Sequence, residues 1–234
     1  MCPVNLHPWN LTPDEAIKVQ MALIQRLVLV WYERQVTTVG GVDIALKEDQ
    51  AHAALVVFRY PDLTPLEGVT ADVPLFFPYI PSLLAFREGP AVLAAWEQLN
   101  VKPDLLMFDG QGIAHPRGIG IASQMGLWLE RPSVGVAKSR LYGHHASPGL
   151  KPGDRTELYD ERQPDRIIGM VLRTRQDTNP LYISPGHLID LPHCIEFVLN
   201  CCRQYRLPEP TRWAHKVAAG EKLPVAEGHQ ARLF

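Results

Sequence analysis

Apolar residues recur at helical spacing near the start of the chain. Thr12 precedes Pro13, and Glu15 follows three residues after the threonine, as in a capping box at the first turn of a helix. Between positions 17 and 28 the apolar side chains then fall three or four residues apart. This pattern predicts a helix over residues 13–33.

The following segments have the composition of strands. Residues 36–46 and 52–60 are rich in β-branched and apolar side chains, and the charged stretch 47–50 separates them. Two such runs joined by a short polar turn predict a β-hairpin. A third short run at 66–73 is expected to continue this antiparallel meander.

Helical and strand-like segments alternate from about residue 89 onward. Because buried strands joined by helices pair in parallel, this half of the chain predicts a parallel sheet covered by crossover helices. The expected helices are 89–100, 117–130, 191–205 and 210–220, and the expected strands are 103–110, 132–138, 166–174 and 180–186. The polar stretch 139–166 has no periodicity and is expected to be a surface loop. The fold class is therefore α/β, with antiparallel early strands and then parallel ones, in a single domain over residues 1–234.

The composition indicates a globular protein and argues against several other classes. The chain has 234 residues and 46% hydrophobic content, enough for a sizeable core, and its net charge of −2 does not indicate a polyanionic partner. The four cysteines have no CxxC spacing, which argues against a disulfide scaffold or a zinc ribbon. No basic and apolar leader opens the chain, so a reduced, cytoplasmic protein without a membrane segment is expected.

One stretch, "PLFFPYIPSLLAFREGP" at residues 74–90, is apolar, rich in proline and tipped by a single acid, Glu88. Proline interrupts it too often for a membrane-spanning helix. We expect a rigid segment whose Phe76, Phe77 and Phe86 are buried in the core.

Acidic residues stand at places where open α/β sheets bind ligands. Asp43 interrupts an apolar strand, and Asp109 ends a buried strand at a glycine-rich turn. Neighbouring carboxylates repel each other unless a cation neutralises them, and with Glu88 they would suit Mg²⁺ or Mn²⁺. The residues alone leave an ordinary alternative open, in which Asp43 faces solvent, Asp109 opens a turn and Glu88 pairs with Arg87 or caps the next helix.

Two neighbouring features point toward phosphate binding. Gly110 and Gly112 would let backbone amides approach a phosphate, and His115 and Arg117 could donate hydrogen bonds to it. Lys138 ends an apolar strand, either snorkelling to the surface or pointing into the same site. A basic groove is expected from seven residues: Arg87, Arg117, Lys138, Arg140, Arg173, Arg175 and Arg212.

The chain resembles the endonuclease V family. The resemblance is carried, in order, by "GGVDIA", "PYIPSLLAFREGPAVLAAWEQL", "PDLLMFDGQGIAHPRGIGIASQMGL", "SVGVAKSRLYG", "NPLYISPGH" and "YRLPEPTRWAH". It implies an RNase H-like fold and a metal-dependent nuclease that cleaves the second phosphodiester bond 3′ to a deaminated adenine, leaving a 3′-hydroxyl and a 5′-phosphate.

The resemblance also implies roles for single residues. Asp43 and Asp109 match the metal-binding aspartates, Glu88 the catalytic glutamate, and Lys138 the lysine near the scissile phosphate. His215 falls where members carry Asp or His and is expected to join the metal shell. Tyr79 matches the wedge that replaces a flipped base. The expected substrate-binding set is Tyr79, Ser82, Leu84, Gly110, His115, Ile121 and Leu141, with Ile121 and Leu141 equally acceptable as core residues.

Two departures from the family pattern bear on the pocket. Ser82 replaces the usual glycine after "PYIP", and Gln111 stands where some members have histidine. If that glycine has a positive φ, Ser82 must be strained.

The expected partner is DNA containing deoxyinosine, with inosine-containing RNA as the alternative, acted on by a monomer. The expected cofactor is Mg²⁺, with Mn²⁺ as the alternative. Two other readings remain open: a different RNase H-like nuclease such as a junction resolvase, and a nucleic-acid-binding module without catalysis.

Overall fold

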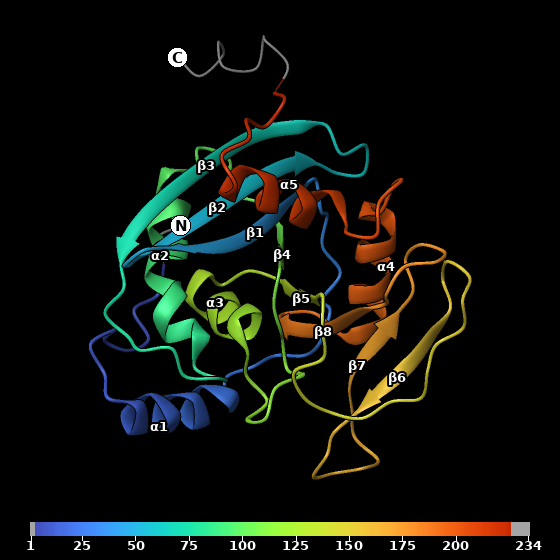
Figure 1. The fold of residues 1–234 in the computed structure, drawn as a ribbon, viewed down its shortest axis with the longest axis horizontal. Helices are drawn as coiled ribbons and strands as arrows, with labels where there is room; N and C mark the ends of the chain where they lie inside the picture. The colour runs from blue at the N-terminus through green and yellow to red at the C-terminus, as the bar shows by residue number, and fades with distance from the viewer. Residues whose placement is uncertain (1–2, 226–234) are drawn as a thin grey trace.

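A computed structural model of the chain describes residues 3–225. It contains one eight-stranded sheet in the order β3-β2-β1-β4-β5-β8-β7-β6 (Figure 1). The first strands are β1 (Thr38–Lys47), β2 (Gln50–Arg59) and β3 (Pro65–Pro74). Each strand pairs antiparallel with the next one along the chain, which confirms the predicted meander.

The middle of the sheet is parallel. β4 (Leu105–Phe108) pairs parallel with β1, and β5 (Ser133–Ala137) pairs parallel with β4. These three adjacent strands therefore run in the same direction, and β4 and β5 end level with the middle of β1.

The far side of the sheet returns to antiparallel pairing, so the parallel pairing expected of the later strands is confirmed for β4 and β5 and is wrong for the two that follow. It consists of β8 (Leu181–His187), β7 (Ile167–Leu172) and β6 (Arg155–Tyr159). The strand β6 lies inside the polar stretch that was expected to be a loop. Its only fully buried side chain is Leu158, so its sequence has little apolar signal, and pairing with β7 holds it in the sheet.

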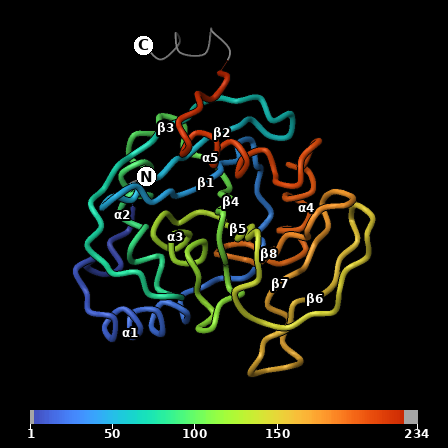
Figure 2. The backbone as a smooth tube through the Cα atoms, in the orientation of Figure 1, coloured from blue at the N-terminus to red at the C-terminus, as the bar shows by residue number. Residues whose placement is uncertain are grey.

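Helices cover both faces of the sheet (Figures 1 and 2). On one face, α2 (Leu84–Gln98) and α3 (Ile121–Leu129) pack against a core that includes Leu55, Leu106 and Phe108. On the other face, α4 (Leu191–Cys201) and α5 (Glu209–Ala218) pack against Phe58, Met107 and Val136. The α/β class with a mixed sheet flanked by helices is confirmed, and this is the architecture expected of an RNase H-like fold.

The first helix, α1 (Pro13–Ile24), begins with the predicted capping box. It ends nine residues before the predicted end at 33, because the following chain is used in tertiary pairing. The Val28 N–H donates to His187 Nδ1 at 3.3 Å, and the Val28 carbonyl accepts from the Leu188 N–H at 2.6 Å. These bonds tie the segment to the end of β8.

The helix α2 starts at Leu84 rather than at 89, so Glu88 and Pro90 both lie inside it. Pro90 removes one backbone donor near the start of the helix without ending it. Phe77 and Phe86 are buried as predicted, whereas Phe76 is 78% exposed, so the prediction that it is buried is wrong.

Among residues 3–225, no helix combines the length and the apolarity needed to cross a membrane. Cys194, Cys201 and Cys202 are free thiols, and burial raises their pKa.

Candidate active site

Strand periodicity places three of the predicted site residues on one face of the sheet. Side chains alternate along a strand, so Asp43 shares the face of Val39 on β1, the face that α5 covers. By the same alternation Asp109 follows Leu105 and Met107, and Lys138 follows Val134 and Val136. Parallel pairing then brings Asp109 and Lys138, just beyond the ends of β4 and β5, next to Asp43 in the middle of β1.

A glycine in β1 lets α5 deliver a fourth residue. A Cβ added to Gly41 would lie 2.0 Å from the Pro210 carbonyl oxygen, so only glycine allows the start of α5 to pack directly on this strand. Five residues further along the helix, His215 projects toward Asp43 in the middle of β1. Its Nδ1 lies 2.8 Å from Asp43 Oδ2.

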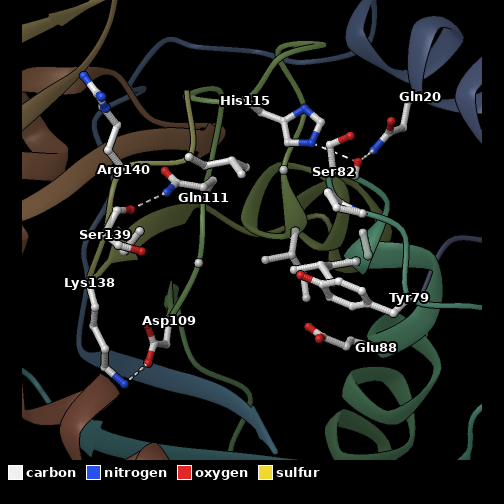
Figure 3. A pocket seen from close by; sticks show the side chains of 18 residues that line it. Gln20, Tyr79, Ser82, Glu88, Asp109, Gln111, His115, Lys138, Ser139 and Arg140 are labelled. Carbon is white, nitrogen blue, oxygen red and sulfur yellow. Dashed lines mark hydrogen bonds and ion pairs between the residues drawn. The ribbon is translucent and has the colours of Figure 1, made fainter. Parts of the chain in front are cut away.

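Asp43, Asp109 and His215 form a cluster that could hold a metal ion. One ligand atom from each lies within 4.8 Å of the others. Asp43 is 8% exposed, so the alternative in which it faces solvent is wrong. Lys138 Nζ forms an ion pair with Asp109, so this lysine points into the site rather than snorkelling away (Figure 3).

Glu88 approaches the cluster from α2, on the opposite face of the sheet, and is not one of the three clustered ligands. Its neighbour Arg87 donates to the Phe77 carbonyl at 2.9 Å. The Arg87 charge lowers the pKa of Glu88, but no ion pair within 4.0 Å joins the two side chains in the described part of the chain. Glu88 is left facing the cavity described below.

Burial and mutual repulsion raise the pKa of two carboxyl groups. Burial is the larger cause for Glu88, and the Asp43 charge adds to it, so the pKa of Glu88 rises to about 7. Burial and the Asp43 charge also raise the pKa of Asp109, against the opposing effect of Lys138. Carboxylates that resist ionisation in this way would be relieved by a shared cation.

A cavity of about 370 Å³ opens beside the acidic cluster (Figure 3). Tyr79 is 64% exposed and lies at this cavity on the loop before α2. The structure brings together every predicted substrate-binding residue, since all of them line the cavity: Tyr79, Ser82, Leu84, Gly110, His115, Ile121 and Leu141. Glu88, Asp109 and Lys138 line it too, so the cavity meets the acidic cluster at Asp109.

The glycine-rich turn uses its polar groups internally rather than presenting them to a phosphate. The Gly112 N–H donates to Ser184 Oγ at 2.9 Å. His115 is buried and donates from Nε2 to the Ser82 carbonyl at 2.9 Å, and burial lowers its pKa to about 4. Gln111 donates to the Ser139 carbonyl at 3.0 Å.

Most of the arginines expected in a basic groove are also used internally. Arg87, Arg117 and Arg173 donate to backbone carbonyls, and Arg212 pairs with Glu209. These four side chains keep their positive charge but have donors engaged within the protein, as Lys138 does with Asp109. Arg140 and Arg175 are exposed. The basic groove stays a prediction.

Two residues near the site were missed in the sequence analysis. Arg206 donates to the Lys138 carbonyl at 2.8 Å and to the Pro180 carbonyl at 2.9 Å, and so holds the backbone that carries Lys138. Gln20 lines the cavity from α1 and is 1% exposed. The sequence offered one signal for each of them. Arg206 lies inside the family block that contains "YRLPEP", and Gln20 is a polar residue on the buried face of α1.

Comparisons with known proteins agree with this geometry. The family model described as Endonuclease V matches residues 22–216. The endonuclease V of Methanothrix thermoacetophila is 46% identical over 210 residues, covering 90% of this chain and 92% of the relative. That of Dehalococcoides mccartyi is 44% identical, covering 92% of this chain and 96% of the relative.

Solved structures are also similar. Bacillus subtilis endonuclease V has a TM-score of 0.88 and 27% identity, covering 94% of this chain and 96% of that one. The Streptomyces avermitilis protein has a TM-score of 0.85 and 36% identity, covering 91% and 93%. A Ciona intestinalis endonuclease V, solved with a 23mer DNA containing an inosine followed by a ribo-adenosine, shares the fold at a TM-score of 0.77 and 23% identity, covering 90% and 98%.

Proposed function

Since this chain belongs to the endonuclease V family and is a phosphodiester hydrolase, we propose that it cleaves nucleic-acid strands beside a deaminated adenine. The bond cut is the second phosphodiester 3′ to the lesion, which leaves a 3′-hydroxyl and a 5′-phosphate. The observation that carries the proposal is the shared cavity, because one space holds apolar and backbone groups suited to a base together with Glu88, Asp109 and Lys138.

The residues at the strand ends fit a divalent metal. Asp43 and Asp109 supply hard oxygen ligands, and His215 supplies an imidazole nitrogen within the same 4.8 Å group. The raised pKa of Asp109 is what a cation at this place would reverse. When bound, Mg²⁺, or Mn²⁺ as the alternative, would supply positive charge to the phosphate and to the attacking water.

The other polar residues are proposed to stabilise charge, to exchange a proton and to position a side chain. Lys138 carries a positive charge beside Asp109 and stabilises negative charge on the scissile phosphate. Glu88, with a pKa near neutrality in the metal-free protein, can exchange a proton with the attacking water. Arg206 is a positioning residue, because it donates to the backbone carbonyl of Lys138 and so fixes the backbone that carries the lysine side chain.

The pocket is proposed to receive the deaminated base after it leaves the stack. Flipping costs a few kcal/mol and is easiest at a mispaired base. Hypoxanthine carries an acceptor at C6 and a protonated N1, both of which differ from adenine. DNA containing deoxyinosine is the proposed substrate, with inosine-containing RNA as the alternative, and the working form is a monomer.

One assay tests this proposal. The substrates are single- and double-stranded DNA and RNA with either hypoxanthine or adenine at one position, and a branched DNA without hypoxanthine. Each is incubated with and without Mg²⁺, and the cut is mapped at nucleotide resolution. We expect metal-dependent cleavage at the second bond 3′ to hypoxanthine and none at adenine controls. Cleavage of branched DNA without hypoxanthine would instead identify a junction resolvase, and binding without any cleavage would identify a binding module.

Tyr79 provides a prediction about lesion recognition. Its exposed ring stands at the mouth of the cavity on a proline-rich loop, placed to fill the gap left by a flipped base (Figure 3). Stacking is worth about 1–3 kcal/mol per base, so Tyr79→Ala should lower kcat/KM on hypoxanthine duplexes about 10-fold or more. The single-turnover rate at saturating enzyme should change less.

Phe76→Ala is the matched control for this variant. Phe76 is an even more exposed aromatic ring on the same loop, but it does not line the cavity. Equal losses in the two variants, or an unchanged hypoxanthine preference in Tyr79→Ala, would contradict the wedge.

A further inference from the structure

The segment at residues 4–9 is fastened to α3, and it lies ahead of the part of the chain that the family model matches, which begins at residue 22. The Val4 N–H donates to the Trp128 carbonyl at 2.8 Å. His7 is 6% exposed, and its Nε2 accepts from Trp128 Nε1 at 3.1 Å. These two bonds hold the segment along one side of α3.

The same segment brings Trp9 against α2. The Trp9 ring stacks on the Trp128 ring with 4.9 Å between the centroids and 22° between the planes. A Cβ added to Gly89 would lie 2.6 Å from Trp9 Cη2 and 2.8 Å from Trp9 Cζ3, so the indole packs directly on the backbone of α2. Only glycine at position 89 leaves room for the ring in this place.

Gly89 directly follows Glu88, the residue proposed to exchange a proton with the attacking water. Figure 3 shows Glu88 on α2 and Asp109 on opposite sides of the cavity that both residues line. The distance between these two residues therefore depends on where the first turns of α2 lie. A displacement of about 1 Å at a catalytic group can lower the rate about 100-fold.

The first turn of α2 has few local bonds to hold it in place. The residue before it, Leu83, makes no side-chain capping bond, and Pro90 has no N–H to donate to the Phe86 carbonyl. Ser82 has a φ of 70°, a left-handed conformation that costs a non-glycine residue free energy, so the strain expected of a serine at this place is present. Contacts from other parts of the chain must therefore hold this end of the helix.

Contacts of two kinds do so, one on each side of the helix. On one side, Arg87 donates to the Phe77 carbonyl at 2.9 Å, which ties the helix to the proline-rich loop. On the other side, Trp9 fills the space that Gly89 leaves open, next to Met125 of α3. Trp9 therefore joins the first turns of α2 to α3.

We propose that Trp9 is a positioning residue for Glu88, because it packs on Gly89 and holds the first turns of α2 against α3. This inference rests on the proposed function. Trp9 is not one of the residues that line the cavity, and it is not part of the metal cluster. Its removal should therefore slow the chemical step and leave the binding of substrate and metal unchanged.

Two substitutions with opposite effects on the packing test this inference. Trp9→Ala opens space beside α2 and should lower the single-turnover rate on a hypoxanthine strand, at saturating enzyme and Mg²⁺, about 10-fold. Gly89→Ala forces a methyl group against the ring and should also lower this rate. In the double variant the methyl group enters the space that the ring has left, so the double variant should cleave faster than Gly89→Ala alone, whereas two independent losses would multiply.

Binding and stability are measured beside the rate. The dissociation constant of a hypoxanthine strand without metal, and the affinity for Mn²⁺ by calorimetric titration, should match the wild type in all three variants. Rates are compared below the unfolding temperature of each variant. Trp9→Leu is a smaller change of volume and gives the same comparison if Trp9→Ala does not fold.

Trp31→Ala is the matched control. Trp31 is a half-buried tryptophan that packs on Phe197 of α4, on the other face of the sheet from α2. Its removal should lower the unfolding temperature without lowering the single-turnover rate.

The outcomes separate this inference from the proposed function. A wild-type protein that does not cleave hypoxanthine strands overturns the proposed function and this inference with it. If the wild type does cleave them, wild-type rates in folded Trp9→Ala and Trp9→Leu proteins overturn the inference alone. A double variant no faster than Gly89→Ala, or a rate loss in Trp31→Ala as large as that in Trp9→Ala, would do the same.

Discussion

Replacing Asp109 with asparagine is expected to lower the cleavage rate about 1,000-fold, equivalent to about 4 kcal/mol of transition-state stabilisation, while the protein still folds. Asn keeps the size of the side chain and removes the charge that the proposed metal needs. The fold should tolerate the change, because burial and the Asp43 charge raise the pKa of Asp109 and make its ionised form costly in the metal-free protein.

Metal binding gives this prediction a readout apart from activity. Calorimetric titration of wild-type protein with Mg²⁺ or Mn²⁺ should show binding, and Asp109→Asn and Asp43→Asn should both weaken it. A chelator should stop wild-type cleavage, and added Mg²⁺ should restore it only in the wild type.

Glu97→Gln is a suitable control, since Glu97 is an exposed carboxylate on α2 outside the cavity. It should bind metal and cleave as the wild type does. An Asp109→Asn protein that still cut at the wild-type rate would remove this residue from the mechanism.

The second large effect is expected at Glu88, where Gln should abolish most cleavage and yet stabilise the metal-free protein at pH 8. Burial and the Asp43 charge raise the pKa of Glu88 from 4.5 to about 7. The folded protein therefore holds this proton more tightly than the unfolded chain does. The contribution to stability is complete below pH 4.5 and is lost as the pH rises through 7.

That loss amounts to about 3 kcal/mol at pH 8, since one pKa unit corresponds to about 1.4 kcal/mol. Glutamine cannot ionise, so Glu88→Gln should unfold at higher urea than the wild type at pH 8 and near the same urea at pH 5, both with chelator present. A stability difference that is the same at both pH values would contradict a raised pKa at Glu88. Glu97→Gln again serves as the control and should show no such pH-dependent gain.

Part of the fold was readable from local patterns. The capping box at Thr12, the hairpin and the two parallel strands each depend on residues close in sequence, and the structure has all of them. The misplaced boundaries have non-local causes. The end of α1 is decided by bonds between Val28 and the end of β8, which is far away in the chain.

In the candidate site, too, some features follow from local sequence and others from contacts between distant segments. The sequence by itself singled out the two acids of the sheet, because apolar strands make an interrupting Asp43 and a terminal Asp109 conspicuous. With the family blocks, it also predicted seven of the residues that line the cavity, together with the lysine and the acid on the proline-rich stretch. Whether those residues act as assigned stays a prediction.

Only the tertiary structure decided how the remaining polar groups are used. Arg117 and His115 have the chemistry of phosphate ligands, but their hydrogen bonds go to a carbonyl in another loop, and Gln20 reaches that carbonyl from a helix sixty-two residues away. Sequence shows what a side chain can donate or accept. The partner that satisfies it depends on which backbone groups the folded chain leaves unpaired nearby, and that is a property of the whole fold.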